Sequence, residues 1–208
     1  MSVFPGDTAL LMIDIQNDFC PGGALAVTEG DRIVPIVNQL QDRFAVRILT
    51  QDWHPSDHSS FADNHVGAQP YSMIQMPYGD QVLWPRHCVQ GSDGAAFHPD
   101  LKTDGADLVI RKGFRSSIDS YSAFFENDKT TPTGLAGYLR ERGVAKLVLT
   151  GLATDFCVFY SAIDGADAGF AVTVLTDCCR AIDLNGSLEA ATAAMIEKDV
   201  RLLESAAL

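Results

Sequence analysis

Four side chains capable of catalysis follow four apolar segments of the chain: Asp14, Asp52, Lys112 and Cys157. Each segment has the pattern of a strand in a parallel sheet, and such sheets bind ligands beyond the carboxyl ends of their strands. We therefore expect the four side chains to meet at one edge of the sheet. There Cys157 could attack a carbonyl carbon, Asp14 could take and return the thiol proton, and Lys112 could favour the thiolate.

The residues around Cys157 predict the start of a helix. Thr154 or Asp155 could serve as the N-cap, which places Cys157 in the first turn. Unpaired N–H groups and the helix dipole favour a thiolate at that position. The alternative interpretation is a small buried cysteine that only packs beneath the helix.

Carboxylates and imidazoles cluster in a part of the chain that has no lysine or arginine from position 48 to position 85. Asp52, His54 and His58 offer one carboxylate and two imidazoles within seven residues. Mixed oxygen and nitrogen ligands suit Zn, Fe or Mn better than Ca or Mg. The sequence therefore predicts a metal site here. Spacing alone does not choose a further ligand among His65, His87 and His98.

Six short apolar runs alternate with amphipathic segments. The runs have the continuous hydrophobicity of strands buried on both faces, and they cover residues 9–13, 46–49, 108–110, 147–149, 172–175 and 200–203. Helical periodicity is found over residues 33–44, 135–139 and 188–195. This alternation predicts a doubly wound, Rossmann-like α/β fold with a mainly parallel six-stranded sheet.

Residues 52–106 show neither a helical nor a strand period. Loops longer than about 15 residues are uncommon in compact domains and are usually functional. We therefore expect a single domain, residues 1–208, with a long metal-binding loop region at about 52–106.

The composition excludes several classes of function. The 208-residue chain has a net charge of −12, which disfavours nucleic acid as a partner because such binding depends on neutralising phosphates. A basic leader and an apolar run of membrane-spanning length are both absent from the sequence, so we expect no membrane partner. Five cysteines without a CxxC pattern fit reduced thiols in the cytoplasm. Dinucleotide, Walker A and G-x-S-x-G motifs do not occur.

Five motifs resemble those of the isochorismatase-like cysteine hydrolases, and within that family the nicotinamidases, also called pyrazinamidases. Residues 12–19 (MIDIQNDF) and 151–158 (GLATDFCV) match patterns shared across the family. The motifs at 52–55 (DWHP) and 84–89 (WPRHCV) are more particular to nicotinamidases, and 111–113 (RKG) is the fifth. The resemblance covers nearly the whole chain and implies a three-layer α/β/α, isochorismatase-like fold.

Carried over by position, the resemblance implies a role for each of these residues. The implied catalytic triad is Asp14, Lys112 and Cys157. The implied metal ligands are Asp52, His54, His58 and His87, so that His65 and His98 are non-ligands. The implied oxyanion hole consists of the N–H groups of Ala153 and Cys157, next to a cis peptide between Leu152 and Ala153. The implied substrate pocket contains Phe19, Trp84, Tyr121 and Leu152, with Phe156 near its mouth.

The resemblance also implies an activity: an amidase that converts nicotinamide to nicotinate and ammonia, and pyrazinamide to pyrazinoate. Cys157 would form a thioester, while one divalent ion (Zn, Fe or Mn) orients the pyridine ring between Phe19 and Trp84. The expected partners are small aromatic amides, and the implied pathway is salvage of nicotinamide to NAD. We expect a cytoplasmic monomer or homo-oligomer.

Three other functions fit parts of this pattern. Another cysteine hydrolase of the family could act on a carbamoyl or ureido group, although the predicted metal ligands disfavour it. A catalytically inactive binding module would not need an intact Asp14, Lys112 and Cys157. A hydrolase that relies on metal hydroxide alone would not need Cys157, and iodoacetamide would therefore leave it active.

Overall fold

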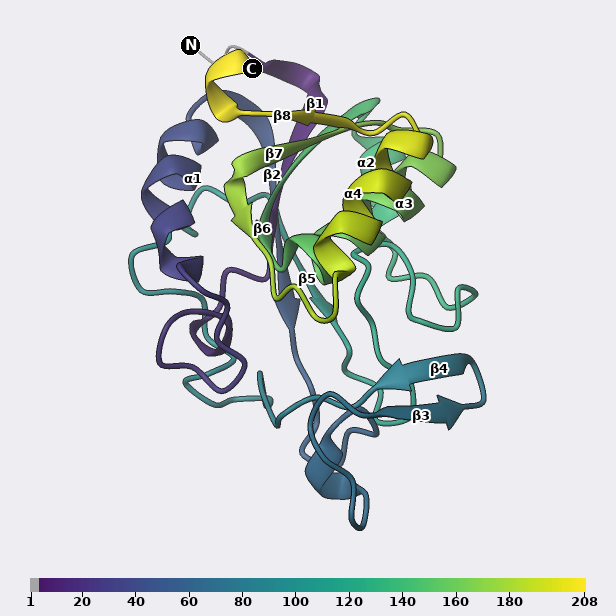
Figure 1. The fold of residues 1–208 in the computed structure, drawn as a ribbon. Helices are drawn as coiled ribbons and strands as arrows, with labels where there is room; N and C mark the ends of the chain where they lie inside the picture. Colours follow the sequence, from purple (N-terminus) through teal and green to yellow (C-terminus); the bar gives the residue numbers. More distant parts are fainter. Residues whose placement is uncertain (1–3) are drawn as a thin grey trace.

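A parallel sheet forms the centre of the molecule, and its six strands coincide with the six apolar runs of the sequence, except that Val200 precedes the last strand. The computed structural model describes residues 4–208 (Figure 1). The strands are β1 (Phe4–Ile13), β2 (Phe44–Asp52), β5 (Leu108–Lys112), β6 (Lys146–Leu152), β7 (Ala171–Arg180) and β8 (Arg201–Leu203). They lie in the order β5-β2-β1-β6-β7-β8, and every neighbouring pair is parallel. The predicted sheet is confirmed.

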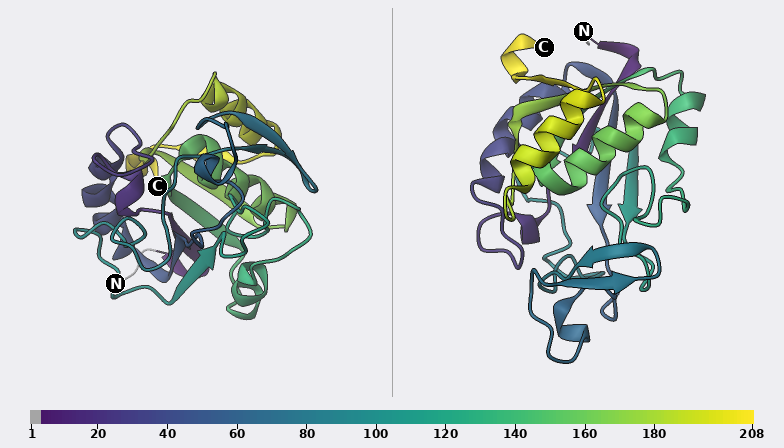
Figure 2. Two further views of the ribbon diagram at one scale, coloured as in Figure 1. Left: turned by 90° about the horizontal axis from the view of Figure 1, so that it is seen from below. Right: turned by 45° about the vertical axis from the view of Figure 1, so that its right-hand side comes forward.

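Helices cover both faces of the sheet, so the fold has three layers. One face carries α1 (Val34–Gln41), and the other carries α2 (Leu135–Glu141), α3 (Phe159–Asp167) and α4 (Ser187–Glu197) (Figures 1 and 2). Side chains of β1 alternate between the layers, because successive residues of a strand point to opposite faces. Leu10 and Met12 pack on the α1 side, whereas Leu11 and Ile13 pack on the other. Burial on both faces explains the unbroken apolar run.

The helical periodicity located α1, α2 and α4 but extended the first helix too far. Phe44, which we assigned to the helical face, is the first residue of β2. Its ring stacks on Phe4 of β1 with the two centroids 4.6 Å apart. Phe44 is buried by this strand contact, and its helical spacing from the residues of α1 is coincidental.

The segment 52–106, which we expected to be a loop region because it shows no strand period, contains a β-hairpin. β3 (Met73–Met76) pairs with β4 (Gly79–Val82) in antiparallel register, and Gly79 has the positive φ of +123° that the connecting turn requires. Each strand has only four residues, which is too short for an alternating pattern to stand out.

The rest of this segment folds back on itself at the carboxyl end of the sheet, below β2 and β5 in Figure 1. Isolated bridges join His54 to Val89 and Phe61 to Trp84, and a third joins Gln16, just after β1, to Phe97. The segment is thereby attached to the strand ends. Within residues 4–208, none of the helices has the length and apolar character needed to cross a bilayer.

Candidate active site

Asp14, Lys112 and Cys157 come together at the carboxyl edge of the sheet. Lys112 Nζ lies 2.8 Å from Asp14 Oδ2 and 3.4 Å from Cys157 Sγ. All three side chains are buried. Asp14 directly follows β1 and Lys112 ends β5, while Cys157 lies in a π-helical turn, Thr154–Val158, that follows β6. The geometry provides a thiol, a carboxylate and an ammonium in mutual contact.

A close approach of β1 and β6 supports this group from behind, and it requires a glycine. A Cβ at Gly151 would lie 2.0 Å from the carbonyl oxygen of Ile13, and Gly151 has a φ of +125°. Side chains rarely adopt that backbone conformation. The peptide bond between Leu152 and Ala153, which follows at once, is cis, as the resemblance implied.

Burial and neighbouring charges determine the protonation states at rest. Burial raises the pKa of Cys157 well above its usual value, and the carboxylates of Asp14 and Asp52 add to this effect, while Lys112 opposes it. Cys157 is therefore a thiol at rest, contrary to the thiolate that its position in a helical turn predicted. Burial also raises the pKa of Asp14, to about 6, although Lys112 lowers it. Asp14 is thus ionised at neutral pH and can accept the thiol proton.

Lys112 links this group to a second one through Asp52. Its Nζ forms a very short ion pair with Asp52 Oδ1 and donates a hydrogen bond to the Ser120 carbonyl at 2.9 Å. Burial alone would lower the pKa of Lys112, but Asp14 and Asp52 raise it well above its usual value. The ammonium therefore stays charged, and it holds the two carboxylates in place.

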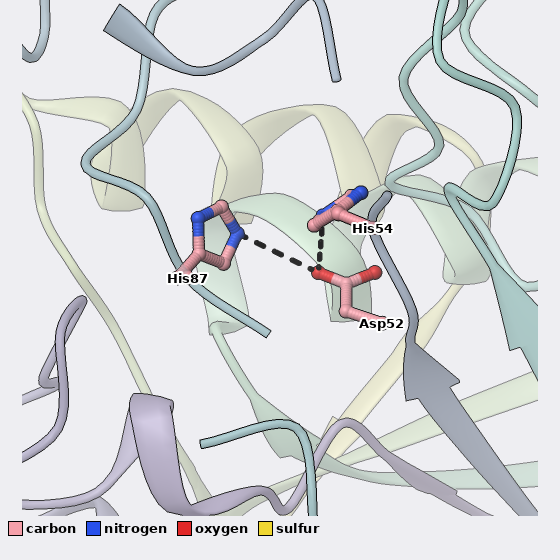
Figure 3. Close-up of side chains that lie close together, drawn as sticks. All are labelled: Asp52, His54 and His87. Atoms are coloured by element: carbon pink, nitrogen blue, oxygen red, sulfur yellow. Dashed lines mark ion pairs between the residues drawn. The ribbon is translucent and has the colours of Figure 1, made fainter. Parts of the chain in front are cut away.

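Asp52, His54 and His87 form a cluster that could hold a metal ion (Figure 3). Asp52 Oδ2 is 3.6 Å from His54 Nε2 and 3.9 Å from His87 Nε2. The other ring nitrogens face backbone carbonyls: His54 Nδ1 is 2.8 Å from Gly113 O, and His87 Nδ1 is 2.7 Å from Pro85 O. When Nδ1–H donates to the carbonyl, Nε2 keeps a lone pair that points at the cluster.

The chemistry of these donors suits a divalent metal ion. Burial lowers the pKa of His87 to about 4, so the His87 ring is neutral and can coordinate. Lys112 holds the pKa of Asp52 well below its usual range, although burial would raise it. One carboxylate and two imidazoles form a donor set found around zinc, iron and manganese.

The resemblance implied that His58 is a fourth ligand; its ring lies against that of His54, with centroids 4.3 Å apart, but its ligand atom does not group with those of Asp52 and His87. Its Nδ1 lies 2.7 Å from Ser60 Oγ, and its Nε2 lies 3.3 Å from the Ile118 carbonyl. The ligand atom of His58 groups with those of His54 and Asp119 instead. Both of its ring nitrogens therefore already face protein partners. His65 and His98, expected as non-ligands, belong to no such cluster within residues 4–208.

A cavity with aromatic walls opens beside both groups. Its lining consists of Phe19, Leu25, Asp52, His54, Trp84, His87, Asp119, Tyr121, Ala153, Phe156, Cys157 and Ile182. The Trp84 and Phe156 rings meet edge to face with centroids 4.9 Å apart. Flat apolar walls with a few polar groups suit a small aromatic ligand.

Three of the four residues implied for the pocket line this cavity, and Leu152 does not. Leu152 is fully buried in the layer on the α1 side, where its Cδ1 would lie 3.3 Å from a Cβ at Gly30. Its side chain belongs to this hydrophobic cluster and not to the lining of the cavity. Conversely, Leu25, Asp119 and Ile182 line the cavity without belonging to any motif. They lie in loops, and only their contacts identify them.

The expected N-caps do not cap the helical turn. Neither Thr154 nor Asp155 forms a capping hydrogen bond there. The Asp155 carboxylate instead accepts hydrogen bonds from the N–H groups of Ile182 and Asp183, at 3.0 and 2.8 Å, and from the Ser187 hydroxyl. Asp155 thus ties the turn to the loop before α4, which places Ile182 against the cavity.

The sequence model of the isochorismatase domain family matches residues 8–206, which is almost the entire chain. The chain belongs to the isochorismatase family. This isochorismatase-family protein is 54% identical over 197 residues to a nicotinamidase of Acinetobacter baylyi, with 95% of this chain and 92% of the relative covered. It is 46% identical over 180 residues to a nicotinamidase of Escherichia coli, with 85% and 84% covered.

Solved structures of relatives share the fold of this isochorismatase-family chain. A nicotinamidase and pyrazinamidase of Acinetobacter baumanii matches with a TM-score of 0.97 and 53% identity over 98% of both chains. PnC1 from L. infantum, in complex with nicotinate, matches with a TM-score of 0.87 and 39% sequence identity, and the match covers 100% of this chain and 98% of that one. A pyrazinamidase of Pyrococcus horikoshii, in complex with zinc, matches with a TM-score of 0.77 and 35% sequence identity. The match covers 95% of this chain and 99% of that one. The predicted fold and family are confirmed.

Proposed function

We propose that this protein is a nicotinamidase, which hydrolyses nicotinamide to nicotinate and ammonia and also converts pyrazinamide to pyrazinoate. One observation carries the proposal: the Asp14–Lys112–Cys157 group and the Asp52–His54–His87 cluster both border a single aromatic cavity. Sequence relatives named nicotinamidases and a solved relative that holds nicotinate support it.

The first half of the reaction forms a thioester. Asp14 accepts the thiol proton of Cys157, and the sulfur attacks the carboxamide carbon, so that a C–S bond forms and the π electrons of the carbonyl move to oxygen. When this tetrahedral species collapses, the C–N bond breaks. Asp14 returns the proton to the departing nitrogen, and ammonia leaves. The acyl group stays on Cys157.

The second half releases the acid. Asp14 takes a proton from water, and the oxygen attacks the thioester carbon. The C–S bond then breaks, nicotinate leaves, and the proton on Asp14 restores the Cys157 thiol. Lys112 keeps its charge throughout, because its two carboxylate partners raise its pKa. Its role is to hold Asp14 and the sulfur within reach of each other.

Charge that develops on the carboxamide oxygen needs hydrogen-bond donors. We assign this role to the backbone N–H groups of Ala153 and Cys157. Ala153 lines the cavity beside Cys157; it directly precedes the π-helical turn, and Cys157 lies within that turn. Donors that are already in place before the reaction stabilise a tetrahedral oxyanion without reorganisation.

Asp52, His54 and His87 would hold one divalent ion of the zinc, iron or manganese class. When bound, the ion supplies a Lewis acid for the ring nitrogen of the substrate. We propose these three protein ligands, without His58, because both nitrogens of His58 face other partners. A relative that carries zinc supports the metal class.

Aromatic side chains of the cavity would bind the substrate ring. Phe19 and Trp84 are assigned to its two faces and Tyr121 to its edge, since all three line the cavity. A ring held in this way presents its carboxamide to Cys157, which converts attack into an intramolecular step.

The decisive experiment measures ammonia release from nicotinamide beside aliphatic amides and carbamoyl compounds, before and after treatment with iodoacetamide. We expect release from nicotinamide and its loss after alkylation. Release from carbamoyl or ureido compounds alone would assign the chain to another branch of the family. Full activity after alkylation of Cys157 would indicate a metal-hydroxide hydrolase.

We further propose that residues 1–208 act as one domain whose segment 52–106 contributes the metal-binding side chains. A cytoplasmic location is proposed as well. All five cysteines are buried and none is in a disulfide, which suits a reducing compartment.

A further inference from the structure

Gln81 is a buried polar residue on the hairpin, and its side chain joins the hairpin to the wall of the cavity. Its exposed fraction is 1%. Gln81 Nε2 lies 2.7 Å from the Val82 carbonyl oxygen, 2.8 Å from Asp119 Oδ2 and 2.9 Å from Tyr121 Oη. Gln81 Oε1 accepts hydrogen bonds from Asn127 Nδ2 at 3.2 Å and from Tyr78 Oη at 3.1 Å.

These partners determine the orientation of the Gln81 amide. Asp119 Oδ2 lies within hydrogen-bond distance of Gln81 Nε2, where it accepts from the NH₂ group. The Asn127 NH₂ group can only donate, so it must face the carbonyl. The opposite orientation of the Gln81 amide would oppose acceptor to acceptor and donor to donor.

The network continues from Gln81 to the aromatic wall. Tyr121 Oη also accepts a hydrogen bond from Trp84 Nε1 at 3.0 Å, and the two rings are nearly perpendicular, with centroids 6.2 Å apart. Asn127 Oδ1, in turn, accepts from the backbone N–H of Tyr121 at 3.0 Å. Gln81 and Asn127 therefore bind both the hydroxyl and the backbone of Tyr121.

The hairpin needs such a connection because an isolated pair of short strands is only marginally stable. Gln81 is the one fully buried residue of β4. None of its hydrogen-bond partners belongs to the Asp14–Lys112–Cys157 group. Its loss should therefore disturb ring binding and leave the reacting groups in place.

We propose that Gln81 is a positioning residue, which holds Trp84 and Tyr121 in the orientation that binds the aromatic ring of the substrate. This inference rests on the proposed function in that it assigns a substrate ring to the cavity. Through Gln81, the hairpin β3–β4 determines the affinity for aromatic amides.

The first test compares Gln81→Met with Gln75→Met, which makes the same substitution at an exposed position of β3. We expect Gln81→Met to raise KM for nicotinamide about tenfold, as the loss of buried hydrogen bonds predicts. Its kcat should stay within about twofold of the wild type, because the triad is untouched. An unchanged KM, a loss confined to kcat, or an equal effect of Gln75→Met would overturn the proposal.

The second test uses Tyr121→Phe, which removes only the hydroxyl that Gln81 and Trp84 share. If both substitutions break the same contact, the double variant with Gln81→Met should raise KM no further than the larger single effect. Multiplied effects on KM would contradict the proposal. If Gln81→Met does not fold, Tyr121→Phe alone still tests the proposal. An unchanged KM in Tyr121→Phe would overturn the proposal.

A measurement without substrate separates this inference from the proposed function. Near-ultraviolet circular dichroism reports the packing of aromatic rings such as Trp84 and Tyr121. We expect Gln81→Met to weaken this signal and Gln75→Met to preserve it. A wild-type protein that releases no ammonia from nicotinamide would refute the proposed function, whereas an unchanged spectrum in Gln81→Met would refute the role of Gln81.

Discussion

The two halves of the active site are built in different ways. The catalytic group, Asp14, Lys112 and Cys157, comes from the ends of sheet strands or the turn after one. In the metal cluster only Asp52 belongs to a strand, where it pairs directly with Lys112. The two histidines of that cluster lie in loops; the Gly113 carbonyl of a distant loop orients the His54 ring, and the Pro85 carbonyl of its own loop orients the His87 ring.

Under the proposed function, this difference separates the chemistry from the binding of metal and substrate. The sheet register sets the spacing of the catalytic group, so its geometry depends on the core of the molecule. The histidines and the aromatic wall depend on hydrogen bonds within and around the segment 52–106. Damage to one half should therefore leave the other half measurable.

The largest effect is expected from Cys157→Ala, which removes the nucleophile. Ammonia release from nicotinamide should fall by a factor of about 10⁴ or more, as for other nucleophile deletions. Metal content should match the wild type, because Cys157 is not a ligand of the cluster. Cys178→Ala, another buried free cysteine, is the control and should retain activity. Substantial turnover by Cys157→Ala would disprove the mechanism.

The next effect separates the histidines. His54→Ala should lower metal affinity by about 100-fold or more, since even partners outside the coordination shell cost 10–100-fold. His58→Ala should bind metal nearly as the wild type does, because His58 lies outside the cluster. Metal content after dialysis, measured by plasma mass spectrometry, distinguishes the two. Equal metal loss in both variants would restore His58 as a ligand.

A third prediction concerns the strand contact behind the catalytic group. Gly151→Ala should lower the free energy of unfolding by about 3 kcal/mol, because its Cβ would overlap the Ile13 carbonyl and its φ is positive. Gly137→Ala, in α2 with open space around it, should raise that free energy by up to about 1 kcal/mol. Urea unfolding measures both, and similar values for the two would contradict the close approach of β1 and β6.

The smallest effect is a shift in pH dependence. Because Asp14 must be ionised to accept the thiol proton and its pKa is about 6, kcat/KM should decline below that pH. Thr50 Oγ1 donates to Asp14 Oδ1 at 2.6 Å and lowers the pKa of Asp14. Thr50→Val should therefore move the acid limb upward by about 0.7 units, the equivalent of one hydrogen bond.

The control for this shift is Thr150→Val. Thr150 is also buried on a neighbouring strand, but its hydroxyl donates to the Leu11 carbonyl. The acid limb of the kcat/KM profile of Thr150→Val should coincide with that of the wild type. A limb that does not move in Thr50→Val would show that a group other than Asp14 controls the decline.

Much of the catalytic half could be predicted from local patterns. The apolar run of residues 9–13 ends at Asp14, and a strand pattern of this kind depends only on neighbouring residues. The same holds for Lys112 after residues 108–110. Parallel strands then bring such ends to one edge, so the meeting of Asp14 with Lys112 followed from the fold class.

The binding half could be predicted only in part. Asp52 and His54 are close in sequence, but the contribution of His87 depends on a loop that returns over a hairpin for which the sequence had no signal. Asp119 and Ile182 line the cavity from other loops. Leu152 was expected in the pocket but does not line the cavity, for the same reason: its place depends on the path of the backbone at the end of β6.

The sequence alone thus specified which reactive side chains end the strands and which family they resemble, because strand patterns and motifs are local. The tertiary structure determined the protonation and the orientation of those side chains. Cys157 is a thiol because residues from distant segments exclude water and place Asp14 and Asp52 beside it. His58 faces Ser60 and Ile118 for a similar reason. Burial and orientation depend on contacts between residues that are far apart in the chain, and short sequence patterns do not predict such contacts.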